Sequence, residues 1–270
     1  MRKLSITDVC RSMLEIYAQR HIPMAAAALS YFLTLTFFPM LICLYTMFGS
    51  IFPASDEIVD FLAGILPPNT IGVILEYLSY VSDNLSTSML LMAMTVLLTS
   101  SSAAFRMVAG VMAEMRGGKR KHSLSAVIFS ACFSLVFLAA IYFSVLMIAT
   151  GKWFLEFADR HIMFMNISDS WGWCRFLLLF FLLFVILSGV YKITSLPGQK
   201  SIFLPGAALA SAALVVLSIA FSFFIGASVK YPLIYGSLAS LVILMFWLYF
   251  CGLILFTGNA LNVSLEKLRR

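Results

Sequence analysis

Charged side chains are scarce in this sequence: only 11% of its 270 residues are Asp, Glu, Lys or Arg, whereas 62% are hydrophobic. Soluble domains carry about 25% charged residues. A soluble fold of this composition would expose large apolar patches to water, which monomeric proteins avoid, whereas a bilayer requires an apolar surface. The composition therefore excludes an ordinary soluble domain and indicates an integral membrane protein.

Groups that could carry catalysis or hold a metal are equally sparse. The six longest apolar runs contain no Asp or Glu, and the three histidines lie outside them. The five cysteines form no C-x-x-C pair, and the chain has no G-x-x-x-x-G-K-[ST] phosphate loop. Because acids within the membrane mark proton relays, their absence argues against a proton pump or a carboxylate-coupled antiporter. Sodium coupling through backbone carbonyls stays open, and the sequence predicts no catalytic residue, metal site or cofactor.

Six apolar runs are long enough to cross the hydrocarbon core, which takes roughly 20 helical residues. Backbone that meets lipid must satisfy its own hydrogen bonds, so each run is expected to be a helix. The runs leave no room for a separate soluble domain. The sequence predicts an all-α, polytopic membrane protein with a single domain over 1–270 and six transmembrane helices at 24–52, 88–112, 124–150, 174–193, 203–228 and 235–261.

The basic residues indicate how these helices are oriented. Most of the 18 Lys and Arg residues fall before the first run or after the second, fourth and sixth runs, which is one side of the predicted membrane. Cytoplasmic loops carry such an excess, so we expect both termini in the cytoplasm. The net charge of +6 is explained by these anchoring clusters. The Lys and Arg residues form no basic stripe with interleaved aromatic residues, so no nucleic-acid partner is expected.

Three further segments are amphipathic and too polar to span the membrane. Apolar residues repeat at helical spacing in 58–65, in 71–78 and near the N-terminus in 6–17. We expect short amphipathic helices lying on the membrane surface. The first two should lie outside, and the N-terminal one inside, where its basic residues suit an anionic leaflet.

Prolines and glycines mark where the transmembrane helices should bend, begin or pack closely. Pro39 should kink the first span because it removes a helical hydrogen bond. Small residues at the start of the fifth and sixth spans favour close helix packing. The candidate break and packing positions are Tyr31, Pro39, Pro205, Gly206, Tyr235 and Gly236.

Polar residues at the inward ends of three spans indicate a candidate binding site. Arg106 lies late in the second span, Tyr191 and Lys192 end the fourth, and Asn259 and Asn262 end the sixth. All five should therefore share a depth near the cytoplasmic side. If they meet, the cations and amides would attract and orient an anionic lipid headgroup. The alternative is ordinary anchoring, in which Lys192 snorkels, Arg106 caps its helix and the asparagines bond carbonyls at a helix end.

Motifs spread along the whole chain resemble those of one family. They are Ala25-Ala26-Ala27-Ala28-Leu29-Ser30-Tyr31-Phe32 with Phe38-Pro39, Tyr191-Lys192, Leu204-Pro205-Gly206-Ala207, Tyr235-Gly236-Ser237-Leu238, Trp247-Leu248-Tyr249, and Gly258 through Asn262. In order and spacing they resemble the YihY/BrkB family of bacterial inner-membrane proteins. The resemblance implies six spans and an inner-membrane location. Members of that family have carried a ribonuclease label and have been linked to export and envelope functions.

Two positions depart from the pattern of that family. Lys192 stands where the family has Arg, which keeps the charge but loses a bidentate fork for phosphate. The family's Gly-Ala-Glu-Leu-Asn reads Gly258-Asn259-Ala260-Leu261-Asn262 here, so Ala260 replaces the glutamate. A family role that rests on this carboxylate is therefore not expected to carry over unchanged.

The residues favour a transporter-like or lipid-handling protein over two rival functions. An uncharged pathway suits an amphipath or lipid better than a small ion, so the expected partners are membrane lipids, including anionic headgroups. The alternative is a structural or assembly partner in a cell-envelope complex, which would co-purify with stoichiometric partners. An enzyme, including a ribonuclease, would need acids or histidines converging on one site, and the spans offer none.

Overall fold

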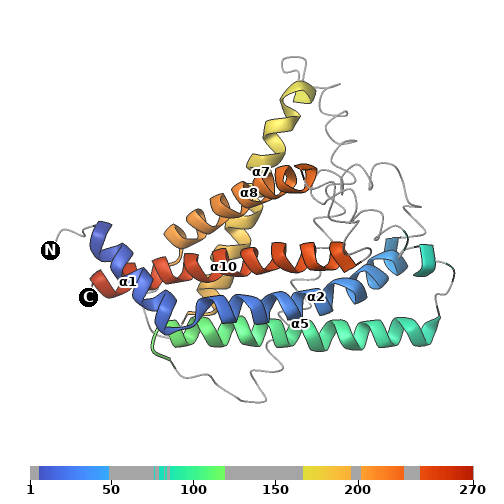
Figure 1. The fold of residues 1–270 in the computed structure, drawn as a ribbon, viewed down its shortest axis with the longest axis horizontal. Helices are drawn as coiled ribbons and strands as arrows, with labels where there is room; N and C mark the ends of the chain where they lie inside the picture. The colour runs from blue at the N-terminus through green and yellow to red at the C-terminus, as the bar shows by residue number, and fades with distance from the viewer. Residues whose placement is uncertain are drawn as a thin grey trace.

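The computed structural model describes residues 6–48, 76, 79–81, 83, 86–118, 167–195, 202–227 and 238–269, and all regular structure within them is helical. The helices labelled in Figure 1 are α1 (Ile6–Gln19), α2 (Ile22–Phe48), α5 (Thr87–Met115), α7 (Ile167–Ile193), α8 (Leu204–Ala227) and α10 (Leu238–Arg269). The prediction of an all-α fold is confirmed for this part of the chain.

Four of these helices contain a stretch that is long and apolar enough to cross a membrane: Ile22–Cys43, Thr87–Met115, Leu204–Phe221 and Leu241–Leu268. The apolar part of α7 is shorter, at Leu179–Ile193. The expected span at 124–150 lies outside the described residues, as do Tyr235, Gly236 and nearly all of 58–78. The chain is thus a helical membrane protein with four candidate spans among its described residues.

Local sequence accounts for both ends of α5. Ser86 accepts a hydrogen bond from the Met89 amide at 3.2 Å, as an N-cap does. At the other end Gly117 has a φ of 79°, and Gly118 N donates to Ala113 O at 2.9 Å. This pattern is a Schellman stop, which needs a glycine in the left-handed region. The stop fixes Arg116 as the C-cap residue.

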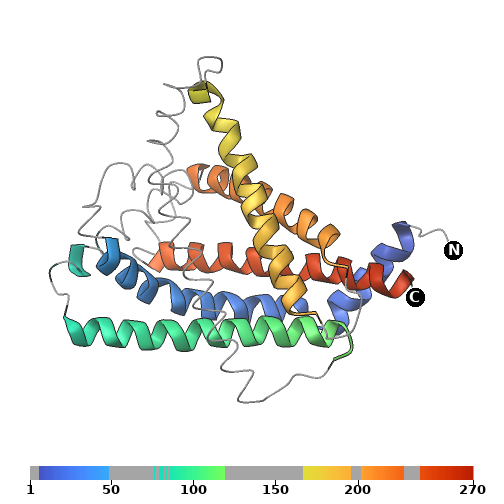
Figure 2. The ribbon, with the colours of Figure 1, turned by 180° about the vertical axis from the view of Figure 1, so that it is seen from behind.

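α10 is central in the packing of the described helices. It contacts α2 on one side and α8 on another, α5 packs along α2, and α7 packs on α8. α2, α5 and α10 run side by side in Figure 1, while α7 crosses obliquely in Figures 1 and 2. The amphipathic N-terminal segment is a helix, α1, as predicted, and it packs against α10.

Of the candidate break and packing positions, two lie within α2 and two lie at the start of α8. α2 continues through Pro39 and curves in its second half (Figure 1). Tyr31 is 54% exposed on the same helix. Pro205 lies in the first turn of α8, where a missing N–H removes no helical bond. Gly206 follows it and is buried against α10.

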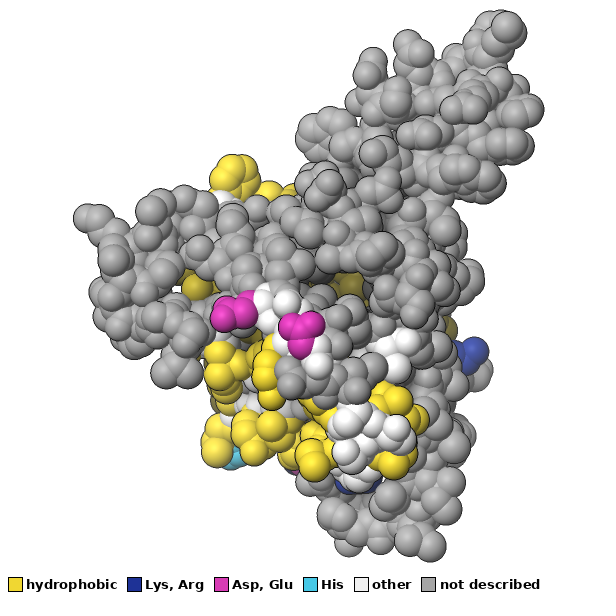
Figure 3. Space-filling view, turned by 90° about the vertical axis from the view of Figure 1, so that its right-hand side faces the viewer, with side chains coloured by type: hydrophobic (Ala, Val, Ile, Leu, Met, Phe, Trp, Pro, Cys, Tyr) yellow, Lys and Arg dark blue, Asp and Glu magenta, His cyan; other side chains and the backbone are white. Residues whose placement is uncertain are grey.

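The largest group of buried apolar side chains lies at the end of the bundle that holds both termini. Its members come from all six helices and include Ile16, Ile22, Met112, Leu187, Ala207 and Phe256. Figure 3 views the opposite end, where acidic side chains lie among hydrophobic ones. α5, α7 and α10 all end on the side of the molecule that holds the termini, and α8 begins there, so the ends of four helices lie near one another (Figures 1 and 2).

Candidate functional site

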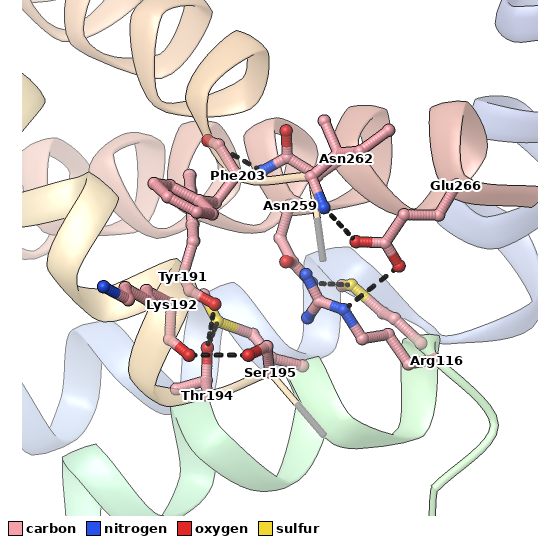
Figure 4. A network of polar contacts seen from close by, with 12 residues as sticks. Arg116, Tyr191, Lys192, Thr194, Ser195, Phe203, Asn259, Asn262 and Glu266 are labelled. Atoms are coloured by element: carbon pink, nitrogen blue, oxygen red, sulfur yellow. Dashed lines mark hydrogen bonds and ion pairs between the residues drawn. The ribbon is translucent and has the colours of Figure 1, made fainter. Parts of the chain in front are cut away.

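One face of α10 carries a stripe of buried polar side chains. Asn259, Asn262 and Glu266 follow one another at spacings of three and four residues, which places them on the same side of a helix. Both asparagines are 0% exposed, and Glu266 is 9% exposed. Figure 4 shows the three side chains pointing toward the ends of α5 and α8.

Asn262 and Glu266 hold the start of α8. The Gly206 amide donates to Asn262 Oδ1 at 2.7 Å, and Asn262 Nδ2 donates to Phe203 O at 3.2 Å. The Ile202 amide donates to Glu266 Oε1 at 2.8 Å. The first N–H groups of a helix need acceptors from outside it. Phe203 has no polar side chain to supply one, so α10 caps α8 from the side.

The same region requires two glycines. A Cβ placed on Gly206 would overlap Gly258 O and the Asn262 amide. A Cβ on Gly258 would lie 2.8 Å from Gly206 O and 2.9 Å from Ala210 Cβ, closer than real Cβ atoms come. Small residues let helix backbones approach in this way. The close approach is what lets the side chain of Asn262 reach the backbone of α8.

Arg116 and Glu266 form a buried ion pair beside this contact. Arg116 Nε lies 3.5 Å from Glu266 Oε2, and the side chains are 1% and 9% exposed. At that separation the contact is an ion pair without a well-formed hydrogen bond. Arg116 is the C-cap residue of α5, whose end carries partial negative charge. Glu266, on α10, accepts from the Ile202 amide just before α8, whose start carries partial positive charge. Each charge therefore lies near the helix end of opposite sign.

Arg116 remains a cation although it is buried. Burial lowers the pKa of the Arg116 guanidinium, and the neighbouring Glu266 carboxylate opposes this shift. The ordinary pKa of arginine is so high that the group stays charged in proteins. A permanent positive charge therefore lies at the centre of the polar network.

The hydrogen-bonding capacity of this network is incompletely used. Among the described residues, none of the three Arg116 side-chain nitrogens has a hydrogen-bond partner, and neither does Asn259 Oδ1. Asn259 Nδ2 donates to Met115 Sδ at 3.2 Å, and a thioether is a weak acceptor. Buried polar groups are almost always bonded, so these atoms distinguish the site from an ordinary packing contact.

α7 closes the network from a third side. Tyr191 is fully buried and donates its hydroxyl hydrogen to Leu255 O at 2.8 Å. One turn of backbone later, Thr194 donates to Met112 Sδ at 3.1 Å, which ties α7 to α5. The network thus joins α5, α7, α8 and α10 at one end of the bundle (Figure 4).

The structure brings together three of the five residues expected at a binding site. Tyr191, Asn259 and Asn262 belong to the network, whereas Lys192 is exposed and its ammonium points away (Figure 4). Arg106 lies roughly ten residues before Arg116, or about 15 Å along α5. Its Nη1 donates to Ser102 Oγ at 2.6 Å. Arg106 therefore lies too far along α5 to join the asparagines.

Sequence reasoning missed the ion pair. Arg116 follows the second apolar run, among the basic residues that the sequence analysis interprets as anchoring charges, and Glu266 follows the sixth run. A signal was present for Glu266, because it continues the spacing of Asn259 and Asn262 along α10. For Arg116 the Gly117-Gly118 stop shows where α5 ends, but its pairing depends on how distant helices pack.

The charge and the unused donors of this arrangement suit the binding of an anion. The described residues contain no group of three or more His, Cys, Asp or Glu side chains that could hold a metal ion. A buried guanidinium with unused donors suits an oxyanion, since its planar fork matches carboxylate and phosphate oxygens. Recognition of an anion is therefore the chemistry that these side chains support.

Comparisons with known proteins identify the family to which the chain is similar. A family model described as "Virulence factor BrkB" matches residues 13–270. The chain is also 23% identical over 255 residues to "Putative ribonuclease-like protein YfkH" of Bacillus subtilis (strain 168), an alignment that covers 91% of this chain and 90% of that protein. No solved structure matches the chain.

Proposed function

The chain belongs to the BrkB family of membrane proteins, and from that premise we propose that it is a transporter-like protein that binds and moves a lipid or another amphipath. The observation that carries this proposal is a buried, permanently charged network at one end of otherwise apolar helices. An amphipath has the matching division into a polar headgroup and an apolar tail. A small ion would need polar groups along its whole path.

The outward surface of the helices supports an amphipathic ligand. Leu177, Phe181 and Val185 form an exposed apolar stripe on α7, and Val216 and Phe223 are exposed on α8. In a bilayer such surface meets acyl chains at no cost in free energy, whereas in water it would be unfavourable. A tail could therefore remain against these faces while its headgroup is held by the network.

The proposed arrangement has six spans, both termini in the cytoplasm, and a location in the bacterial inner membrane. Arg116 and Lys192 lie at the end of the bundle that holds both termini, while Glu76 and Asp83 are exposed on the segment before α5 begins. Basic residues favour the cytoplasmic side. On this reading the network faces the inner leaflet, where anionic lipids supply negative headgroups.

Lipid movement can be measured with the purified full chain in liposomes. A phosphatidylglycerol probe with a quenchable headgroup reports how fast lipid crosses between leaflets, and protein-free liposomes give the background. We expect faster crossing with the protein, and a slower rate for Asn262→Leu, which disrupts the network. A rate equal to background, together with stoichiometric envelope proteins in the purified sample, would instead establish the alternative of an assembly partner.

The ribonuclease-like name of the Bacillus subtilis protein is not carried over to this chain. Metal-dependent nucleases need clustered carboxylates, and metal-independent cleavage would need a paired acid and base, for example two histidines. We propose that the purified protein does not cleave RNA. Cleavage that survives extensive purification and is lost in Glu266→Gln would overturn this part of the proposal.

A further inference from the structure

We propose that Arg116 and Asn259 form an oxyanion site that recognises a phosphate group, with Glu266 as a competing internal anion. The lipid form of this ligand, a phosphate in a headgroup, rests on the proposed function. Free phosphate has the same oxygen acceptors, and its binding at this site would not depend on the proposed function.

The guanidinium of Arg116 has more donors than its surroundings use. Arginine presents five N–H donors in a planar fork, and the nearest carboxylate oxygen of Glu266 lies 3.5 Å from Nε. The other Glu266 oxygen accepts from the Ile202 amide. Among the described residues, Nη1 and Nη2 have no hydrogen-bond partner. A guanidinium binds phosphate in a bidentate way when two parallel N–H groups donate to two phosphate oxygens.

Asn259 supplies a second, adaptable contact. Its side chain is 0% exposed, and Figure 4 shows its amide beside the guanidinium of Arg116. In the structure Nδ2 donates to the Met115 thioether while Oδ1 has no partner among the described residues. Rotating the amide by half a turn gives up only a weak N–H···S bond and directs two N–H donors toward the anion position.

Glu266 keeps the site nearly neutral until an anion arrives. Without this carboxylate, Arg116 would be a buried charge lacking any counter-ion, which is strongly unfavourable. Its long 3.5 Å contact leaves it open to replacement by a better acceptor. Glu266 and a phosphate would then compete for the same cation, so removal of the carboxylate charge should strengthen binding of the anion. A purely structural ion pair makes no such prediction.

Neither of the other candidate cations fits this role as well. The Nη1 atom of Arg106 donates to Ser102 at 2.6 Å, so that side chain already has a close partner. The side chain of Lys192 is exposed and points away from the asparagines. Arg116 alone among these three combines burial, a nearby amide and unused donors.

The proposal can be tested by measuring binding of acyl-labelled phosphatidylglycerol to the purified full chain in detergent, with diacylglycerol of the same acyl composition as the phosphate-free probe. We expect phosphatidylglycerol to bind and diacylglycerol not to bind. Inorganic phosphate is then added as a competitor: displacement of the lipid identifies free phosphate as a ligand, and no displacement identifies the headgroup. Absence of saturable binding of both phosphatidylglycerol and phosphate would overturn the proposal.

Two near-isosteric variants distinguish a binding site from a structural ion pair. Glu266→Gln keeps an acceptor for Ile202 but removes the competing charge, so we expect about tenfold tighter binding of the anion. Asn259→Asp adds a carboxylate beside Arg116, so we expect about tenfold weaker binding with little loss of thermal stability. Arg11→Gln is the matched control, because Arg11 pairs with Glu15 on an exposed helix face, and its affinity should equal that of the parent.

Failure of this site and failure of the proposed function give different results. If the parent binds phosphatidylglycerol with the expected variant pattern but does not move lipid in liposomes, the transport proposal is wrong and the site stands. If lipid moves at the parental rate in Glu266→Gln and Asn259→Asp, and neither affinity changes, the site is wrong. Arg116→Gln removes the cation and Glu266→Gln leaves it without its counter-ion, so the affinity of each is compared only in protein that folds. Asn259→Asp keeps the ion pair and carries the test if they do not fold.

Discussion

Replacing Gly258 by alanine tests the close contact on which the polar network depends. The new methyl group would lie 2.8 Å from Gly206 O and 2.9 Å from Ala210 Cβ, and it would also meet the hydroxyl of Tyr191. The first of these atoms belongs to backbone, so the strain cannot be removed by a side-chain rotation. Overpacking of this kind costs about 1–3 kcal/mol.

A second loss adds to this strain. The Tyr191 hydroxyl must move from the added methyl group and gives up its 2.8 Å bond to Leu255 O, which is worth about 1 kcal/mol. We therefore expect Gly258→Ala to lower the free energy of unfolding by about 2–4 kcal/mol, or to lower the Tm by roughly 5–15 °C. Tyr191→Phe should cost less in the Gly258→Ala background than in the parent, because the hydrogen bond is already lost there.

A thiol-reactive fluorogenic dye offers a suitable assay in detergent. Cys43 is buried and Cys251 is partly buried, so both become reactive as the helices separate, whereas Cys10 is exposed from the start. Gly189→Ala is the matched control, because a Cβ on Gly189 meets no atom within 4 Å. If both alanine variants melt within a degree or two of the parent, the close α8–α10 contact is wrong.

Three further measurements address the buried ion pair, the contact between Asn262 and α8, and the orientation in the membrane. Removing either Arg116 or Glu266 alone should lower the free energy of unfolding by about 3–5 kcal/mol. Removing both should lower it by less than the sum, which a double-mutant cycle of denaturant unfolding measures, and additive losses would contradict the buried pair. Asn262→Leu should cost about 2 kcal/mol by the same measurement, because two hydrogen bonds to the start of α8 are lost. A cysteine at Lys119 should resist an impermeant maleimide in intact cells, and labelling from outside would reverse the proposed orientation.

Much of the helical architecture could be predicted from the sequence because a bilayer imposes a length on each apolar run. The expected span at 88–112 corresponds to α5 over Thr87–Met115, and the one at 203–228 to α8 over Leu204–Ala227. Backbone hydrogen bonds must be satisfied within each helix, so little tertiary information is needed. The amphipathic N-terminal helix was predictable for a similar reason, since its apolar spacing needs one packed face.

The end of the last helix shows where this reasoning fails. The predicted span stops at 261, where apolar residues give way to polar ones, but α10 continues to Arg269. Val263 is 2% exposed and Glu266 is buried as well, so packing against other helix ends continues the helix after hydropathy has fallen. The ordinary-anchoring alternative expected asparagines that bond carbonyls at a helix end. Asn262 does bond one, Phe203 O, but at the start of α8, where it also accepts from the Gly206 amide.

The ends of the spans can be predicted from sequence, but which residues at those ends meet cannot. The five candidate site residues were grouped by the ends of the spans that carry them. That criterion was too coarse to separate Arg106 from Arg116, which lies about 15 Å further along the same helix and is the cation that meets Glu266. Which helix ends become neighbours depends on small contact residues, here Gly206 and Gly258, whose partners are far apart in the chain.

The two contacts of Glu266 connect recognition of an anion to the packing of the helices. One carboxylate oxygen holds the start of α8 through Ile202, and the other faces Arg116 at the end of α5. A phosphate that takes Arg116 away from Glu266 weakens the tie between α5 and α10, whereas Asn262 continues to hold α8 on α10. A ligand shifts a conformational equilibrium only through its different affinity for the two states, and competition for one cation supplies such a difference. The proposed site would therefore loosen α5 from the α8–α10 pair when a headgroup binds, which is the kind of coupled movement that carrying a lipid across a membrane requires.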